Sequence, residues 1–379
     1  MTLMPNYAAP RVTFVRGEGS HLWDTDGREY LDFLCGIAVT SLGHAHPAVA
    51  DAVCSASRTL LHVSNLFGTE PQREVAATLD RLLGGGGKVF FANSGAEANE
   101  CAIKLARRSG GPARRGIVSA LGSFHGRTLG ALAATGQPAK HEPFTPLPGG
   151  FRHVEYGDLD ALAAAVDGSV AAVLLESVQG ESGVVTPAAG YLAGARRICD
   201  DAGALLVLDE VQTGLGRTGR WWGFEHEGIR PDVVTSAKAL GNGVPIGACW
   251  ARAEVADAFR PGDHGSTFGG QPLAASAARA VLAVMEAEDV PARAAAMGAR
   301  LHRAAEAVAG VTGVRGVGLL LAAELAVPSA DAAAACLEHG LVVNNVTPTA
   351  LRLAPSLLIT PDEVDEGVSR LAAALRALA

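Results

Sequence analysis

The chain is poor in lysine and carries no excess of positive charge. Only four of its 31 basic residues are lysines, at positions 88, 104, 140 and 238, and the formal net charge is -8. A protein without a basic field is not expected to bind nucleic acid or an anionic membrane surface. Where a positive charge alone is sufficient this chain uses arginine, so a lysine among small residues indicates amine chemistry.

Patterned cysteines and long apolar runs are also missing. The six cysteines form no C-x-x-C pair and no framework spacing, which predicts neither disulfides nor a zinc site, and favours buried thiols in a reducing compartment. Pro5 and Asn6 interrupt the N-terminal apolar stretch, and Glu324 interrupts the later run at 316–327. We therefore expect a cytoplasmic protein without a membrane-spanning segment.

The middle of the chain has the pattern of an α/β protein. Short continuous apolar runs alternate with helical patterns, as is typical of parallel strands covered on both faces. Strands are predicted at 88–93, 116–120, 171–177, 204–210, 232–236 and 246–251. The predicted fold is a mostly parallel central sheet with helices on both faces, within a large domain at 51–270.

The two ends of the chain predict smaller units. Residues 12–33 alternate apolar and polar positions around turn signals, which indicates an antiparallel meander in an N-terminal segment at 1–50. Helices are predicted at 47–61 and from Thr69, with Gln72 as the capping-box partner. A small α+β domain is predicted at 271–379. Its predicted elements are strands at 317–325, 341–346 and 351–355 and a final helix capped by Thr360 and Glu363.

Two motifs suggest sites but fit simpler structures better. The run 84-GGGGK-88 lacks the spacing of a phosphate loop, because Leu82 and Val89 stand where glycine and a hydroxyl residue are needed; a helix end and a turn are predicted instead. The pair His44 and His46 has no third ligand in view, so a histidine pair capping the helix at Pro47 is favoured over a metal site. No metal is predicted.

A stronger anion site is 92-ANSGAEANE-100, which follows one strand and opens a helix. Ser94, Gly95 and Ala96 would offer free backbone N–H groups and one hydroxyl at the positive end of the helix dipole. An ordinary serine N-cap with Glu97 as its partner fits the same residues equally well.

Two charged residues stand at neighbouring strand ends. Asp209 ends the apolar run 204–209, and Lys238 follows the run 232–234. In an open α/β sheet such positions face one crevice, where they could form a salt bridge or bracket an aromatic cofactor. Pyridoxal phosphate needs an anion at its ring nitrogen, a lysine for its aldehyde and a helix N-terminus for its phosphate. Asp209, Lys238 and the segment at Ser94 supply these three groups.

Together with these residues, the rest of the sequence resembles the class III, fold-type I pyridoxal phosphate aminotransferases, in particular their acetylornithine branch. The resemblance covers essentially the whole chain. It is carried by motifs such as 93-NSGAEANECAIKLAR-107, 123-SFHGRTLGALAATG-136, 208-LDEVQTGLGRTG-219 and 235-TSAKALGNGVPIGA-248.

The resemblance implies roles around the cofactor. Lys238 would join the cofactor aldehyde and move the substrate proton, Asp209 would pair with the ring nitrogen, and Gln212 would reach the ring hydroxyl. Phe124 would stack on the ring, while Ser94, Gly95 and Ala96 would bind the phosphate. Thr267 would join that phosphate from the other subunit of a homodimer. Ala96 stands where relatives have threonine.

The resemblance also implies how substrates are held. Arg352 would bind the α-carboxylate of glutamate or 2-oxoglutarate, and Arg127 would bind the second carboxylate. With the longer amine bound, Glu181 would pair with Arg352 and mask it. Tyr7 would line the pocket.

The predicted reaction moves the δ-amino group of N2-acetyl-L-ornithine to 2-oxoglutarate, as a step of arginine biosynthesis. It gives N-acetyl-L-glutamate 5-semialdehyde and L-glutamate by a ping-pong mechanism. Ornithine, succinyldiaminopimelate and other ω-amines are alternative donors. An aminomutase or a cofactor-binding regulator would be alternatives of another class. An aminomutase would complete turnover with the donor alone, and a regulator would lack one of the catalytic residues.

Overall fold

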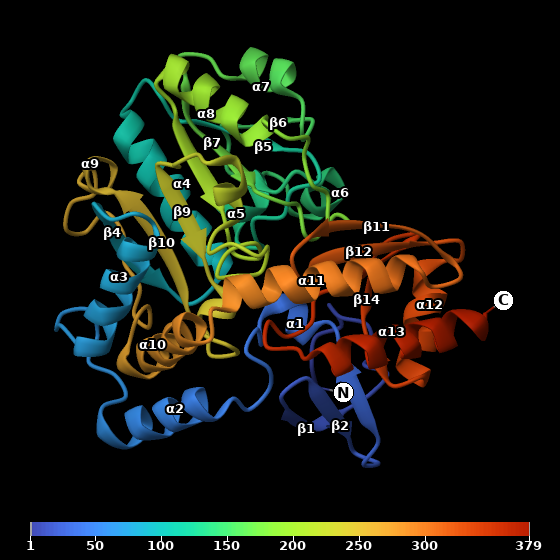
Figure 1. Ribbon diagram of the computed structural model, residues 1–379. Coiled ribbons are helices and arrows are strands. Elements are labelled where there is room, and N and C mark those ends of the chain that lie inside the picture. Colours follow the sequence, from blue (N-terminus) through green and yellow to red (C-terminus); the bar gives the residue numbers. More distant parts are fainter. Residues whose placement is uncertain (1, 379) are drawn as a thin grey trace.

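The central feature of the computed structural model, which describes residues 2–378, is a seven-stranded sheet with the order β4-β10-β9-β8-β7-β5-β6 (Figure 1). Its strands are β4 (Gly87–Ala92), β5 (Gly116–Ala120), β6 (Phe151–Val154), β7 (Val170–Glu176), β8 (Leu205–Asp209), β9 (Val233–Ser236) and β10 (Gly247–Arg252). The five strands β5 to β9 are parallel, and β10 is antiparallel to both β4 and β9. The predicted mostly parallel sheet is confirmed.

Helices cover both faces of this sheet, and successive residues of β7 show how. Every residue of β7 is buried. Val173 and Leu175 pack in one hydrophobic cluster with Leu192, whereas Leu174 packs in a second cluster with Ile103. Because side chains alternate between the faces of a strand, a strand covered on both faces is apolar throughout. The helices and 3-10 turns connected with this sheet are α3 (Glu70–Leu82), α4 (Gly95–Gly110), α5 (Leu129–Ala134), α6 (Pro138–His141), η1 (Glu142–Phe144), α7 (Leu159–Ala165), α8 (Tyr191–Ala202), η2 (Gly223–Glu227), η3 (Lys238–Leu240) and α9 (Ala253–Ala256).

Two four-stranded sheets form the rest of the molecule. The first has the order β1-β2-β3-β13 and confirms the predicted N-terminal meander, and the second has the order β11-β12-β15-β14. Their strands are β1 (Phe14–Glu18), β2 (His21–Asp24), β3 (Glu29–Asp32), β11 (Val311–Val317), β12 (Leu320–Leu325), β13 (Leu341–Val342), β14 (Asn344–Thr347) and β15 (Ala350–Leu353). The remaining helices are α1 (Cys35–Ala38), α2 (Pro47–Thr59), α10 (Pro272–Ala287), α11 (Val290–Glu306), α12 (Ser329–Glu338) and α13 (Pro361–Arg376). Figure 1 shows α11 crossing from the large sheet to β11 and β12.

Two predicted strands near the C-terminus were wrong as single elements. The run at 317–325 is divided between β11 and β12, because Gly318, at φ 58°, turns the chain back between them. The run at 341–346 is divided between two sheets, since β13 pairs with β3 whereas β14 pairs with β15. The edge strand β6 was not predicted. The domain boundaries at residues 50 and 270 stay predictions.

Some of the predicted helix ends are confirmed and one is wrong. Thr360 and Glu363 form the expected capping box, and three glycines of positive φ turn the chain after α3, as predicted for the run at 84–88. The box at Thr69 was wrong, because Gln72 Nε2 donates to Asn65 Oδ1 (2.8 Å) instead.

The predicted histidine cap of α2 was also wrong. His46 occupies the N-cap position, but its side chain makes no capping hydrogen bond. The ring of His44 turns away to Asp32, with 2.7 Å between Nε2 and Oδ2. Neither histidine side chain therefore caps α2.

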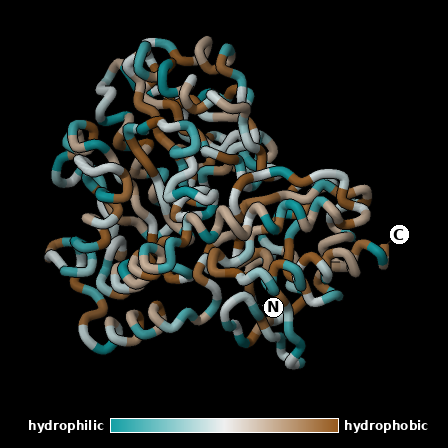
Figure 2. Tube along the Cα trace, in the orientation of Figure 1, coloured by the Kyte–Doolittle hydropathy of each residue, from teal (hydrophilic) through white to brown (hydrophobic). Residues whose placement is uncertain are grey.

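Apolar and polar residues are separated between the interior and the surface. In Figure 2 the apolar segments concentrate in the strands of the large sheet, and hydrophilic segments lie mostly at the periphery. Five of the six cysteines are buried as predicted, and Cys54 is exposed. None of the helices among residues 2–378 is long and apolar enough to cross a membrane.

Candidate active site

Three parallel strands end in charged residues at one edge of the large sheet. Glu176 ends β7, Asp209 ends β8, and Lys238 lies two residues beyond β9. Glu176 and Asp209 are direct neighbours in the β7–β8 register. All three line a cavity of about 490 Å³. The parallel register therefore brings together residues that are far apart in the sequence, at the edge where α/β sheets bind ligands.

Most of the predicted site residues line this cavity. They are Ser94, Gly95, Ala96, Phe124, Arg127, Glu181, Asp209, Gln212 and Lys238. Arg352 lies behind Gln212 with 2% of its surface exposed, and its NH1 is 3.4 Å from Gln212 Oε1. Thr267 is exposed and lines a separate hollow, and Tyr7 is 86% exposed. The roles of Thr267 and Tyr7 stay predictions.

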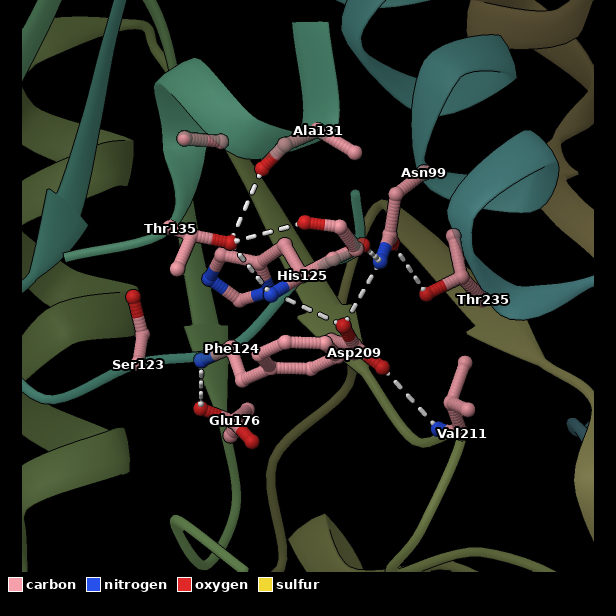
Figure 3. Close-up of polar contacts among 12 residues, drawn as sticks. Asn99, Ser123, Phe124, His125, Ala131, Thr135, Glu176, Asp209, Val211 and Thr235 are labelled. Atoms are coloured by element: carbon pink, nitrogen blue, oxygen red, sulfur yellow. Dashed lines mark hydrogen bonds and ion pairs between the residues drawn. The ribbon is translucent and has the colours of Figure 1, made fainter. Parts of the chain in front are cut away.

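Asp209 is fixed by three hydrogen bonds (Figure 3). Its Oδ2 accepts from Asn99 Nδ2 at 2.7 Å and lies 2.8 Å from His125 Nδ1, while its Oδ1 accepts from the Val211 backbone N–H at 3.0 Å. Asn99 Oδ1 in turn accepts from the hydroxyl of Thr235 (2.7 Å). Phe124 lines the same cavity as this carboxylate. Such a network holds a buried carboxylate in one orientation toward the cavity.

Lys238 lies on a short turn with an uncommon backbone. Its φ is 43°, and η3 begins at this residue, with one residue between it and the end of the buried strand β9. Burial lowers the pKa of Lys238 to about 8, with the positive charge of Arg352 acting in the same direction and Asp209 and Glu176 opposing it. A left-handed conformation in a non-glycine residue is associated with functional positions. Lys238 thus has the environment expected of an amine that exchanges protons near neutral pH.

At the start of α4, Ser94 can be both the N-cap of the helix and part of an anion site. Ser94 Oγ accepts from the backbone N–H of Glu97 at 3.2 Å, so the serine is the N-cap, and Glu97 in turn accepts from Asn93. The hydroxyl hydrogen of Ser94 is still available to a ligand, as are the first N–H groups of the helix. Gly95 packs so closely that a Cβ there would lie 2.8 Å from Val211 Cγ1.

Glu176 is a second buried carboxyl group in the cavity wall. Its Oε2 accepts from the backbone N–H of Phe124 at 3.1 Å. Burial, together with the negative charge of Asp209, raises the pKa of Glu176 well above its usual value. Both effects disfavour a second negative charge beside Asp209.

Glu181 and Arg352 do not bond to each other in this structure. Glu181 Oε1 instead accepts from Lys140 Nζ at 2.7 Å, from the short helix α6. Arg352 NH1 donates to the Gly180 carbonyl (3.0 Å). The predicted pairing of Glu181 with Arg352 concerns the amine-bound protein and stays a prediction.

Sequence reasoning missed four residues of this site: Asn99, His125, Glu176 and Lys140. Glu176 carries the same signal as Asp209, a carboxylate at the end of a buried strand, and could have been found by it. Lys140 is one of the four lysines. Asn99 and His125 gave no signal of their own, because their contact with Asp209 depends on how α4 and the segment before α5 pack.

Almost the whole chain matches one known protein family. A model of the family described as Aminotransferase class-III matches residues 3–375 of this chain. The chain belongs to the class III aminotransferases. This confirms the predicted family, and with it the fold-type I architecture and the assignment as a transaminase.

Individual class III aminotransferases resemble the chain over nearly its full length. The acetylornithine aminotransferase of Mycolicibacterium smegmatis is 52% identical over 376 residues, covering 98% of this chain and 96% of the relative. The structure of N-acetylornithine aminotransferase from Stenotrophomonas maltophilia is 38% identical with a TM-score of 0.85, covering 97% of each chain. An ornithine aminotransferase structure from Toxoplasma gondii, with partial occupancy of PLP at its active site, is 34% identical with a TM-score of 0.94. It covers 99% of this chain and 92% of that one.

Proposed function

We propose that this aminotransferase uses pyridoxal phosphate to move the δ-amino group of N2-acetyl-L-ornithine to 2-oxoglutarate. The products are N-acetyl-L-glutamate 5-semialdehyde and L-glutamate, a reaction of arginine biosynthesis. The observation that carries the proposal is the cavity in which Asp209, Lys238 and the start of α4 meet. The choice of donor is supported by the 52% identity to an acetylornithine aminotransferase.

The residues of the cavity fit pyridoxal phosphate. Ser94 and the first N–H groups of α4 suit its phosphate, Phe124 offers a ring face, and the fixed carboxylate of Asp209 suits its ring nitrogen. When bound, pyridoxal phosphate supplies an aldehyde that takes up the amino group and a ring that withdraws electrons from the reacting carbon. Gln212 lines the same cavity and would hold the ring hydroxyl.

The chain itself supplies the proton transfer. With a pKa of about 8, about a tenth of Lys238 is neutral at pH 7, against less than about a thousandth of a lysine with the ordinary pKa of about 10.4. Lys238 can therefore take a proton from the substrate carbon and return it to the cofactor side.

Arginines provide the carboxylate sites. Arg127 lines the cavity, with its guanidinium carbon 5.8 Å from the centre of the Phe124 ring, and Arg352 lies buried behind Gln212. We propose that Arg352 binds the α-carboxylate of glutamate and that Arg127 binds the second carboxylate.

A donor panel tests the proposal. Purified protein with pyridoxal phosphate and 2-oxoglutarate is assayed for glutamate formation with N2-acetyl-L-ornithine, L-ornithine and N-succinyl-LL-diaminopimelate. We expect the highest kcat/KM with N2-acetyl-L-ornithine. If kcat/KM is higher with another donor, that donor is the substrate in place of N2-acetyl-L-ornithine. Completed turnover with the donor alone would indicate an aminomutase.

L-Ornithine is the second candidate donor. It is favoured by the TM-score of 0.94 to an ornithine aminotransferase. The two donors differ by one acetyl group on the α-nitrogen, so their ratio of kcat/KM in the same panel separates them.

We further propose a cytoplasmic homodimer in which each subunit lends Thr267 to the other subunit's phosphate site. Thr267 is exposed in the single chain and lies outside the cavity of Lys238. Sedimentation velocity should give the mass of a dimer, and Thr267→Ala should weaken cofactor binding in a dimer of unchanged mass. A monomer with full activity would overturn this part.

A further inference from the structure

Lys140 forms the one ion pair with Glu181 among the described residues. The distance between Lys140 Nζ and Glu181 Oε1 is 2.7 Å, and the two side chains are 22% and 34% exposed. Lys140 Nζ also lies 5.0 Å from the centre of the Phe124 ring, which forms part of the cavity wall. The pair thus stands at the cavity and is better shielded from water than a fully exposed pair.

The backbone around Lys140 is tied to the core of the site. Its neighbour His141 contacts the Thr135 carbonyl through Nε2 at 2.6 Å. Thr135 Oγ1 accepts from the backbone N–H of His125, whose ring contacts Asp209. The chain segment that carries Lys140 is therefore linked to the hydrogen bonds around Asp209.

Arg352 has no carboxylate partner among residues 2–378. Its guanidinium donates to three neutral acceptors, at 3.0 Å to Gly180 O, 3.2 Å to Asn344 Oδ1 and 3.4 Å to Gln212 Oε1. Burial lowers the pKa of Arg352, and the charge of Glu181 raises it, so Glu181 acts on Arg352 without touching it. Two cations, Lys140 and Arg352, therefore compete for one carboxylate.

We propose that Lys140 is a specificity-determining residue, because its ion pair with Glu181 keeps Glu181 away from Arg352 and leaves Arg352 open to the α-carboxylate of a dicarboxylate substrate. The inference deepens the proposed function and rests on it for the identity of the two substrates. Loss of the Lys140 charge frees Glu181 to bond with Arg352. The site then favours the amine donor over glutamate or 2-oxoglutarate.

Binding of glutarate, a dicarboxylate without a reacting group, tests this directly. Titration calorimetry on the holoenzyme compares the unmodified protein with Lys140→Met, Lys140→Gln and Lys140→Arg. We expect Kd to rise about fivefold in the first two variants, the size typical of a partly shielded ion pair, and to change less than about twofold in Lys140→Arg, which keeps the charge. Lys88→Met is the matched control, since Lys88 pairs with Asp257 at an exposed surface.

The two half-reactions give the second readout. In Lys140→Met, KM for L-glutamate should rise about fivefold with kcat little changed, while KM for the amine donor should stay equal or fall. Equal losses in both half-reactions would indicate a merely structural role and overturn the proposal. So would an unchanged Kd for glutarate in both neutral variants.

A double substitution separates a switch from a direct contact. In a Glu181→Gln background nothing can mask Arg352, so adding Lys140→Met should leave glutarate affinity unchanged. A further fivefold loss there would mean that Lys140 binds the dicarboxylate itself and would overturn the proposal. If the unmodified protein binds glutarate with the predicted Lys140 dependence but transfers no amino group from any donor, the proposed function fails while the ion-pair competition stands.

Discussion

Lys88 and Lys238 lie at opposite ends of the same sheet, and only Lys238 lines the cavity where Glu176 and Asp209 meet. Lys88 is near the beginning of β4, pairs with Asp257, and more than half of each side chain in this pair is exposed. Lys238 follows the end of β9 and is surrounded by Arg352, Asp209 and Glu176, which act on its pKa. Lysine is therefore a solvated charge at one end of the sheet and an amine with a lowered pKa at the other.

The reason for the difference is the direction of the strands. The beginnings of the strands are reached by turns such as the one at 84–86, whose three glycines take positive φ. Their carboxyl ends are followed by loops that return over the sheet and enclose a crevice. Burial of Lys238 there lowers its pKa because the low-dielectric surroundings disfavour the charged amine.

The largest expected effect distinguishes the two lysines directly. Lys238→Ala should abolish turnover, by at least about a thousandfold, because Lys238 is the only lysine among residues 2–378 that lines the cavity and could serve the covalent and proton-transfer steps. Lys88→Ala should keep nearly full activity. Glutamate formation over many turnovers measures the activity of both variants. Multiple turnovers by Lys238→Ala would contradict the assignment of Lys238 as the catalytic lysine.

Substitution of the carboxylate near each lysine should also affect activity to different extents. Asp209→Asn should lower kcat/KM by about a thousandfold, the value of one close charge pair at an effective dielectric of about 20. Asp257→Asn, which removes the partner of Lys88, is the control and should have little effect. Comparable losses in both variants would show that Asp209 acts through the fold and not through its charge at the site.

A smaller loss is expected from the residues that position Asp209. Asn99→Ala or His125→Phe should each lower kcat about tenfold, because each removes one hydrogen bond to a buried carboxylate. Donor KM should change little, since Asn99 Nδ2 and His125 Nδ1 are engaged with Asp209. In an Asp209→Asn background the same substitutions should cost much less, and full additivity would contradict a positioning role.

The reactivity of Lys238 should depend on pH in a defined direction. Because the pKa of Lys238 is lowered to about 8, its neutral form grows through pH 8 and is nearly complete by about pH 9. Brief acetylation of the cofactor-free protein, followed by peptide mass spectrometry, should give a midpoint near 8. A lysine in an added unstructured peptide should titrate near about 10.4, and a coincident midpoint for Lys238 would contradict the effect of burial.

The smallest effect is expected at the opposite end of the sheet. Gly85, at φ 74°, has open space where a Cβ would stand, so Gly85→Ala should cost only the strain of a left-handed alanine, about 1 kcal/mol of the free energy of unfolding. Activity should be unchanged. Urea unfolding measures the loss, and reduced kcat at full folding would indicate that this turn is coupled to the site.

Residue patterns alone were sufficient to predict most strands of the large sheet, two of its charged strand ends and the family. Continuous apolar runs predicted six of the seven strands of the large sheet, because a strand buried on both faces must be apolar throughout. The same runs located Asp209 and Lys238 at strand ends, and long ordered motifs indicated the family. The edge strand β6 gave no such signal, since its polar Arg152 and His153 break the apolar pattern.

Tertiary packing decided what adjacent residues in the sequence cannot specify. Gly318 turns the chain so that β11 and β12 pair with each other, whereas the run at 341–346 gives one strand to each of two sheets. Asn99 and His125 reach Asp209 from segments 110 and 84 residues away. Likewise, the sequence determined that Lys238 is an amine, whereas its pKa of about 8 and the pairing of Glu181 with Lys140 depend on burial and distance, which only the folded chain provides.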